Sequence, residues 1–389
     1  MIKILSALFL MTASLFSQDF EQFLDNAIKN SPYLKASNLS IQQIAQTAQV
    51  LTRYENPTLE LEFSNFRPDF TNDMNGHRIA YSQPIRLWGV GDAKDELSLA
   101  MQNTASSTYQ LDLANFKKNI ALAYTHYSNK KQLLLLGDEE LTIAKKIYDI
   151  SQERNRAGTI SKSELLQSLV EYEMIKVKVQ NLKFTTQESY YALLKTAGYS
   201  HEIELDFSYK FKLHEGNLKI HNPDLSLIQS EQQQSLASTQ VNSNAIEWIS
   251  LIAQYEAEPG QNIFRIAAEI PLAFFNTKKE EMRISQLSSN KAELMLQNKK
   301  ARLSIETIQR TRQRELLLEL RTLNEDTLKN QMKLLKMFEE GYKIASINLL
   351  QHQSIKNNMI QTKENIIKIN TALNQNAILT NYIKGIYND

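Results

Sequence analysis

Four short segments of the chain alternate between apolar and polar residues, which is the pattern of a β-strand with one apolar face. The alternation is regular at about 57–66 and 262–271 and weaker at about 77–86 and 247–256, where Ile252 falls on the polar side. The apolar positions that we expect to share one face are Leu59, Leu61, Phe63, Phe264, Ile266 and Ile270. The polar positions expected on the opposite face are Glu60, Glu62, Arg78, Arg265 and Glu269.

Two much longer segments follow a helical pattern, with apolar residues at spacings of three and four. They are predicted to form helical hairpins over about 91–197 and 277–388, held together by coiled-coil-like apolar seams. Each hairpin turns near a glycine, Gly158 or Gly341, and a serine follows each glycine closely. We expect both glycines to adopt the left-handed conformation that ends a helix, so that a second helix starts just beyond. Gly137 lies inside the first long run and is a candidate position for a local irregularity.

The prolines indicate that this arrangement occurs twice. Proline breaks helix interiors, so its absence from the long helical runs permits long helices and its clustering marks bends. The prolines fall in two windows, which hold Pro32, Pro57, Pro68 and Pro84, and then Pro223, Pro259 and Pro271. The chain is therefore predicted to be mainly α with a small β part, a duplicated unit of two strands and one long helical hairpin. We expect a first repeat over 18–200, a linker over 201–222 and a second repeat over 223–389.

Composition argues against several classes of function. The 44 lysines and arginines nearly balance the 43 aspartates and glutamates, and a net charge of +1 gives no support for nucleic-acid binding. Cysteine is absent, which excludes disulfides and thiolate metal sites, and the six histidines form no metal-binding motif. No nucleotide-binding or nucleophile motif occurs. We therefore expect no enzyme activity, no catalytic residues, no metal site and no cofactor.

The N-terminal residues have the pattern of a secretory signal peptide. Lys3 precedes an apolar stretch at 4–16, and Ser17 is a small residue suited to cleavage, so residues 1–17 are predicted to be removed. The alternative is a buried N-terminal helix. No later apolar run reaches the roughly 18 residues of a transmembrane helix, so an exported chain that spans a membrane must do so with strands.

The four alternating segments have a length that suits a membrane. Each is close to the roughly 9–11 residues with which a tilted strand crosses a bilayer. Four strands cannot close a barrel, and lipid does not tolerate an open sheet edge. Three copies of the chain would supply a twelve-stranded transmembrane barrel, with the apolar face toward lipid and the polar face toward the lumen. The alternative is a pair of soluble hairpins that pack on the helices.

In these features the chain resembles the TolC family of outer-membrane efflux proteins. The resemblance extends from the signal peptide through the duplicated unit, with a proline where strand passes to helix and a glycine at each hairpin tip. The stretches Tyr-Ser-Gln-Pro-Ile at 81–85 and Leu-Trp-Gly at 87–89 are similar to the heavy-metal, CzcC/CusC-like branch of that family.

The resemblance implies a homotrimer that forms one conduit, a β-barrel in the outer membrane and an α-barrel across the periplasm. It also implies that the hairpin tips bind a periplasmic adaptor (a membrane fusion protein), which links the channel to an inner-membrane RND-type pump. The tip residues that would make this contact and gate the channel are Gly158, Ser161, Glu164, Gly341, Asn348 and Gln351. Asn348 and Gln351 match positions where relatives of TolC itself carry aspartates, so no ring of carboxylates is expected there. Glu164 is the nearest charged candidate; alternatively, it is an acid favoured by the dipole of a helix start.

The function implied is a passive outer-membrane duct for a proton-driven pump, with heavy-metal cations as its substrates. Drugs or other small molecules are the alternative cargo. A periplasmic coiled-coil adaptor is a second hypothesis, although adaptors normally carry one helical hairpin and not two. A helical enzyme or ligand-binding protein without a recognisable motif is a third.

Overall fold

The computed structural model describes residues 19–67, 74–214, 222–344 and 346–387, so the predicted signal peptide lies outside the described residues. The chain divides into two compact units. Unit 1 comprises Met1–Tyr33, Leu113–Ile220 and Ser304–Asp389, and unit 2 comprises Leu34–Asp112 and His221–Leu303. Each unit contains chain from both halves of the sequence, so the compact units cut across the duplication.

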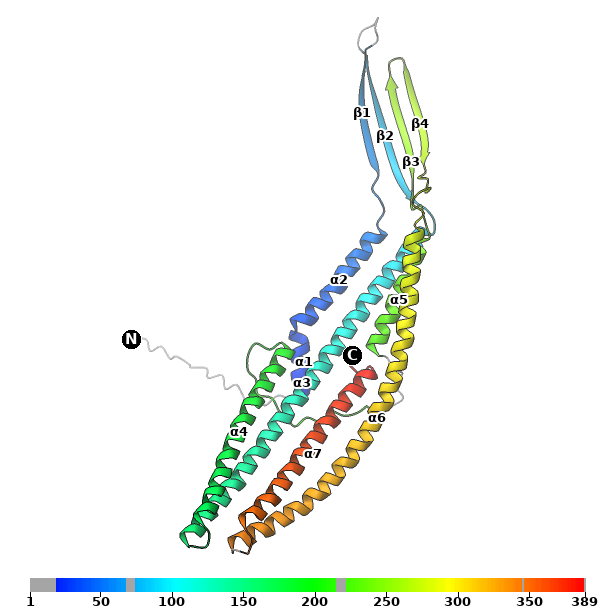
Figure 1. Ribbon diagram of the computed structural model, residues 1–389. Coiled ribbons are helices and arrows are strands. Elements are labelled where there is room, and N and C mark those ends of the chain that lie inside the picture. Colours follow the sequence, from blue (N-terminus) through cyan, green and yellow to red (C-terminus); the bar gives the residue numbers. More distant parts are fainter. Residues whose placement is uncertain (1–18, 68–73, 215–221, 345, 388–389) are drawn as a thin grey trace, which may run out of the picture. The chain divides into compact units, whose positions relative to one another are not determined.

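The secondary structure follows the duplicated order, in which a strand pair precedes each long helical hairpin (Figure 1). The helices are α1 (Phe20–Asn30), α2 (Pro32–Thr52), α3 (Val90–Arg156), α4 (Lys162–Ala197), α5 (Pro223–Asn242), α6 (Lys279–Lys343) and α7 (Leu349–Ile383). The strands are β1 (Thr58–Phe66), β2 (Met74–Arg86), β3 (Trp248–Glu258) and β4 (Gln261–Glu269). The predicted fold class, mainly helical with a small β part, is confirmed.

Helices α3 and α6 are unusually long, with 67 and 65 residues, and each passes from unit 2 into unit 1. Neither contains a proline, so no residue removes a main-chain hydrogen bond from the helix interior. The irregularity considered at Gly137 does not occur, because α3 continues through it. A Cβ atom at Gly137 would lie 2.7 Å from Cδ1 of Leu182 on α4, so this glycine permits close packing of two helices.

The sheet belongs entirely to unit 2 and has the strand order β1-β2-β3-β4, with every neighbouring pair antiparallel. The two strand pairs of the duplication join through β2 and β3, where Ile79 lies opposite Tyr255. β1 and β4 are consequently the edges of the sheet. Each pairs on one side only among the described residues.

Unit 1 has an aromatic core to which α1, α3 and α4 contribute. The rings of Phe20 and Tyr124 lie 4.8 Å apart, and those of Phe23 and Tyr199 stack at 5.2 Å. The hydroxyl of the fully buried Tyr124 donates to the carbonyl of Asp206 at 2.9 Å, so its polar atom is satisfied inside the core. This core fixes the segment that follows α4 against the helices.

The helices of unit 2 are joined by polar pairs as well as by small apolar residues. The hydroxyl oxygens of Ser107 on α3 and Ser230 on α5 lie 2.7 Å apart. Lys299 on α6 forms an ion pair with Asp224 on α5 at 3.1 Å. Directional contacts of this kind set how the three helices align along their length.

Candidate functional site

One face of the sheet carries the apolar residues that the sequence singled out. The register aligns Leu59 with Tyr81 and Leu61 with Ile79 across β1 and β2. It continues across β3 to Ile266 and Phe264 on β4, so these side chains form rows on one face. The predicted apolar residues Leu59, Leu61, Phe63, Phe264, Ile266 and Ile270 are all exposed. An exposed apolar surface of this kind marks a contact with lipid or with another protein.

Ile270 differs from the other members of this set. β4 ends at Glu269, so Ile270 lies just beyond the strand and not within the ladder. Its apolar side chain is nevertheless exposed next to the end of the sheet.

The opposite face of the sheet carries the predicted charged residues. Arg78 lies between two carboxylates of β1, with its Nη2 atom 2.7 Å from Glu60 and 2.5 Å from Glu62. Arg265 on β4 pairs with Glu256 on β3, and Glu269 lies opposite Ser250. The register aligns Glu62, Arg78 and Glu256 across three strands, so acidic and basic groups alternate along this row.

Glu256 is a residue of this face that the sequence analysis did not name. It accepts from Arg265, and it lies directly opposite Arg78. The signal was present in the sequence, because the apolar alternation of β3 at 249, 251, 253 and 255 places position 256 on the polar side.

Arg86 forms the junction at which the sheet meets the helices of unit 2. Its guanidinium donates to the carbonyls of Thr52 at 2.9 Å and Arg53 at 2.6 Å, which are orphan acceptors at the end of α2. The same guanidinium lies over the rings of Tyr54 and Trp248, at 4.8 and 4.5 Å from their centroids.

Glu247 completes this junction from the segment before β3. It lies 3.4 Å from Arg86 Nε and pairs with Lys94 of α3, while its carbonyl accepts from the Leu87 N–H at 2.9 Å. One arginine and one glutamate therefore connect the ends of α2, β2 and β3 and the start of α3.

The first hairpin tip, in unit 1, behaves as the sequence predicted. Gly158 has a φ of +74° after the end of α3, the left-handed conformation that favours glycine. Ser161 then starts α4, because its hydroxyl accepts the N–H of Glu164 at 3.1 Å. Glu164 stands in the first turn of α4, where the helix dipole favours an acid.

The second hairpin tip corrects the prediction for Gly341. Gly341 lies inside the last turn of α6, which ends at Lys343, and it is not among the residues with positive φ. Gly341 is required for steric reasons, because a Cβ atom at this position would lie 2.7 Å from Cδ1 of Ile347. Ser346 does not restart the helix either, since its N–H and hydroxyl both bond to the carbonyl of Gly341.

Asn348 is the residue that starts α7. Its side chain accepts the N–H of Gln351 at 2.9 Å, and the Gln351 side chain accepts the N–H of Asn348 at 3.2 Å, which is a capping box. Both residues of the predicted gate pair therefore have a local helix-capping role in this structure.

Behind the second tip, polar groups of α3 hold Tyr342 in place. The hydroxyls of Ser151 and Tyr342 lie 2.8 Å apart, and Arg154 donates to the Tyr342 carbonyl at 3.0 Å. His352 lies beside them, 1% exposed, and neither of its ring nitrogens has a hydrogen-bond partner among the described residues. Burial lowers the pKa of His352 to about 4, so the ring is neutral at pH 7.

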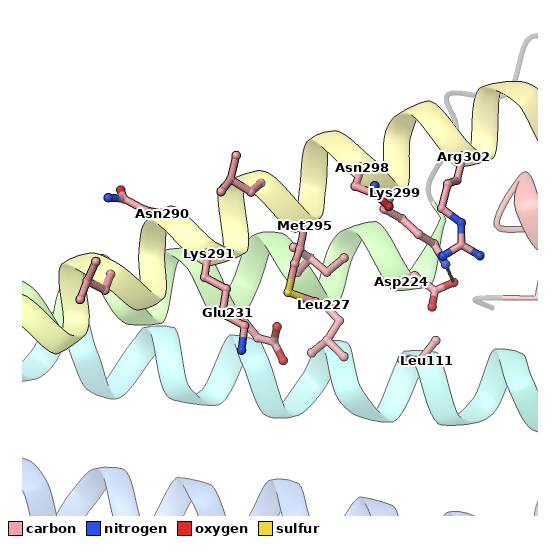
Figure 2. Close-up of a pocket in the computed structure, with 13 residues that line it drawn as sticks. Leu111, Asp224, Leu227, Glu231, Asn290, Lys291, Met295, Asn298, Lys299 and Arg302 are labelled. Atoms are coloured by element: carbon pink, nitrogen blue, oxygen red, sulfur yellow. Dashed lines mark ion pairs between the residues drawn. The ribbon is translucent and has the colours of Figure 1, made fainter.

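A groove lies between α5 and α6 in unit 2 (Figure 2) and has a volume of about 820 Å³. Asp224 and Lys299 pair at one part of its rim. The apolar residues that line it are Leu111, Leu227, Ile228, Leu287, Leu294 and Met295. The lining residues include no serine, cysteine or histidine.

Two further features are absent from the described residues. The described residues contain no group of three or more histidine, cysteine, aspartate or glutamate side chains arranged to hold a metal ion. Across the same residues, none of the helices combines the length and the apolar character that a membrane-spanning helix needs.

Comparison with known proteins identifies solved structures that have a similar fold. No protein-family model and no curated protein matches the sequence. The outer-membrane channel OprN matches with a TM-score of 0.78 at 13% identity, over 94% of this chain and 89% of that one. The CmeC outer-membrane channel of Campylobacter jejuni matches with a TM-score of 0.75 at 16% identity, over 94% of this chain and 85% of that one. CusC, described as forming a transmembrane channel, matches with a TM-score of 0.74 at 14% identity, over 94% and 91%. The chain thus has the fold of outer-membrane channel proteins, the fold that its sequence led us to expect.

Proposed function

We propose that this protein is a member of the TolC family and forms the outer-membrane channel of a tripartite efflux system. The observation that carries the proposal is the two-faced sheet. One face is apolar and exposed, the other carries paired charges, and the edge strands β1 and β4 each pair on one side only within the described part of the chain. A sheet with an apolar outer face can enter lipid only if its edges are paired, because unpaired backbone groups are costly there.

Pairing those edges requires further copies of the chain. Three protomers would join β4 of one to β1 of the next and close a twelve-stranded barrel. The strands have 9 to 13 residues, which suits the roughly 9–11 residues of a tilted membrane strand. In this homotrimer Leu59, Leu61, Phe63, Phe264 and Ile266 meet the lipid, with Ile270 at the edge of the barrel.

The charged face would line the lumen. Glu60, Glu62, Arg78, Arg265 and Glu269 keep it wet, and Glu256 joins them. These residues are four glutamates and two arginines, and both arginines are paired with carboxylates, so the lumen face carries an excess of acidic groups. We expect weak selection by charge, and the chain acts as a passive duct.

The hairpin tips are the proposed contact with a periplasmic adaptor, which in turn connects to an inner-membrane RND-type pump that supplies the energy. Gly158 and Gly341 shape the two tips, and Ser161, Asn348 and Gln351 cap the helices that follow. Glu164 is exposed only in part and is the candidate acidic contact beside the first tip.

Heavy-metal cations are the proposed cargo. The support is the similarity of residues 81–85 and 87–89 to the CzcC/CusC-like branch. Other small molecules are the alternative cargo, since channels outside that branch have a similar fold. Growth of a deletion strain on a panel of metals and antibiotics distinguishes them: unchanged metal tolerance with lost antibiotic tolerance contradicts the metal assignment.

Location tests the channel itself against the second candidate, a soluble periplasmic adaptor. We expect the processed protein, cleaved near Ser17, in the outer-membrane fraction and resistant to extraction by salt. Recovery in the soluble periplasmic fraction would eliminate the channel.

A further inference from the structure

We propose that Trp88 and Phe275 form an aromatic anchor that sits in the headgroup zone of a phospholipid bilayer, at the end of the sheet where strands pass into helices. This inference rests on the proposed membrane-spanning role of the sheet. It assigns a partner, the lipid interface, to residues that neither the strands nor the hairpin tips use.

The duplication places the two aromatic residues at equivalent positions. Trp88 follows Pro84 by four residues, and Phe275 follows Pro271 by the same spacing. Trp88 is 91% exposed and Phe275 is 102% exposed, so both rings project fully from unit 2. Two large aromatic rings left in water at matching positions of a repeat indicate a shared external partner.

The strand register brings the two segments to one level of the sheet. Pro84 of β2 lies opposite Ser250 of β3, and Ser250 lies opposite Glu269, the last residue of β4. The segments that carry Trp88 and Phe275 therefore leave the sheet at the same end, within a few residues of each other along the strand direction.

The surroundings favour the interface over the hydrocarbon interior. The exposed apolar face of the sheet continues into the exposed side chains of Ile270, Leu272 and Phe274. Charged residues follow within four positions in both segments, with Asp92 after Trp88 and Lys279 after Phe275. A surface that changes from apolar to charged over so few residues matches the boundary between acyl chains and headgroups. Tryptophan and other aromatic rings concentrate at that boundary.

The other tryptophan provides the contrast. Trp248 is partly buried, because Arg86 stacks on its ring at 4.5 Å and Tyr54 lies 5.7 Å away. The chain contains only 2 tryptophans, so single-tryptophan variants report on each environment separately.

The experiment uses the full mature protein in vesicles of phosphatidylethanolamine and phosphatidylglycerol. Trp248→Phe leaves Trp88 as the reporter, and Trp88→Phe leaves Trp248 as the matched control. Ile266→Trp in the double-phenylalanine background reports on the middle of the sheet, because Ile266 lies opposite Ala253, which in turn lies opposite Tyr81 near the centre of the ladder. Emission is measured with aqueous iodide and with lipids brominated either near the headgroup or near the middle of the acyl chain.

We expect Trp88 emission to shift to shorter wavelength in vesicles and to be quenched most by bromines near the headgroup. The Ile266→Trp reporter should be quenched most by mid-chain bromines. Iodide quenching of Trp88 without bromine quenching, while the Ile266→Trp reporter is quenched by bromine, would overturn the anchor and leave the channel intact. Trp88 quenched most at mid-chain, or protected from both quenchers, would also overturn it. If neither reporter responds to bromine, the membrane-spanning sheet fails, and the anchor fails with it.

Discussion

The guanidinium carbon of Arg86 lies 4.5 Å from the centroid of the Trp248 ring, and the same guanidinium donates to two carbonyls at the end of α2. The Arg86 side chain is only 4% exposed. The planar guanidinium thus stacks on Trp248, donates to the α2 carbonyls and forms an ion pair with Glu247 at the same time. A lysine ammonium cannot make these three interactions together. This makes Arg86 the residue that connects the sheet to the helices of unit 2.

Replacing Arg86 should weaken that junction. Arg86→Lys keeps the charge and loses the fork of donors, so we expect a loss of about 1–3 kcal/mol in the free energy of unfolding. Arg86→Ala should cost more, since the α2 carbonyls lose their donor and Glu247 keeps only Lys94 as an ion-pair partner. Denaturation followed by Trp248 fluorescence measures the effect. Arg53→Ala is the control, because the contact uses only the Arg53 carbonyl. Equal stability of wild type and Arg86→Lys would contradict this role.

A buried ion cluster ties α3, α4 and α7 together in unit 1. Lys356 is 2% exposed and pairs with Glu171, and it lies 3.6 Å from Glu140. Lys178 bridges Glu140 at 2.9 Å and Glu364 at 3.1 Å.

Removing Lys356 should leave two carboxylates without their buried cation. We expect Lys356→Met to lower the free energy of unfolding by about 3–5 kcal/mol. Lys363→Met is the matched control, since Lys363 and Glu139 are more exposed and such pairs contribute about 1 kcal/mol or less. Circular dichroism during urea unfolding measures both variants. Adding Glu171→Gln to Lys356→Met should restore part of the loss, and no restoration would argue against the pairing.

His352 gives unit 1 a pH dependence. Burial lowers its pKa to about 4, with Lys356 and Lys146 acting in the same direction and Glu339 opposing them, beside the ring of Tyr342. An unfolded histidine has a pKa of about 6.5, so the unfolded state binds a proton first as the pH falls. The contribution of the neutral His352 to the free energy of unfolding is therefore complete above about pH 6.5. It is lost as the pH falls from about 6.5 to about 4, by about 3 kcal/mol in total.

His352→Leu tests this dependence. The variant should lose less stability than the wild type between pH 7.5 and pH 5, as measured by urea unfolding at each pH. The exposed His201→Gln serves as the control and should leave the wild-type slope unchanged. A His352→Leu slope identical to that of the wild type would show that His352 titrates normally.

The two tip glycines should respond differently to substitution. Gly158 needs a positive φ and has open space around it, so Gly158→Ala should cost about 1–2 kcal/mol and Gly158→Asn less, because asparagine tolerates that conformation. Gly341 needs space, so Gly341→Ala should cost about 1–3 kcal/mol, and Gly341→Asn should be no better. Thermal unfolding, with hydrogen exchange at the tips, separates the cases. Equal rescue by asparagine at both sites would contradict the distinction.

Local sequence patterns accounted for much of the fold. Alternation in 58–63 and 264–270 is enough to assign β1 and β4 and their faces, because a strand with one apolar face repeats every two residues. Proline-free stretches likewise indicate α3 and α6. A glycine at a hairpin tip, as at Gly341, has two possible physical causes. It either permits a positive φ or avoids a steric contact, and the sequence does not distinguish the two.

The contacts between distant segments were not predictable in this way. Arg86 meets the end of α2 and Lys356 meets Glu171 only because particular helix and strand ends come together in the fold. Neither contact leaves a periodic trace in the sequence. Glu256 is the intermediate case, because its face followed from alternation but its partner Arg265 followed only from the register of β3 with β4.

The mass of the purified protein in detergent tests the central claim most directly. If β1 and β4 are completed by neighbouring copies, native mass spectrometry should give a complex of three protomers that survives dilution. A stable monomer that remains folded and soluble after the detergent is removed would contradict the channel.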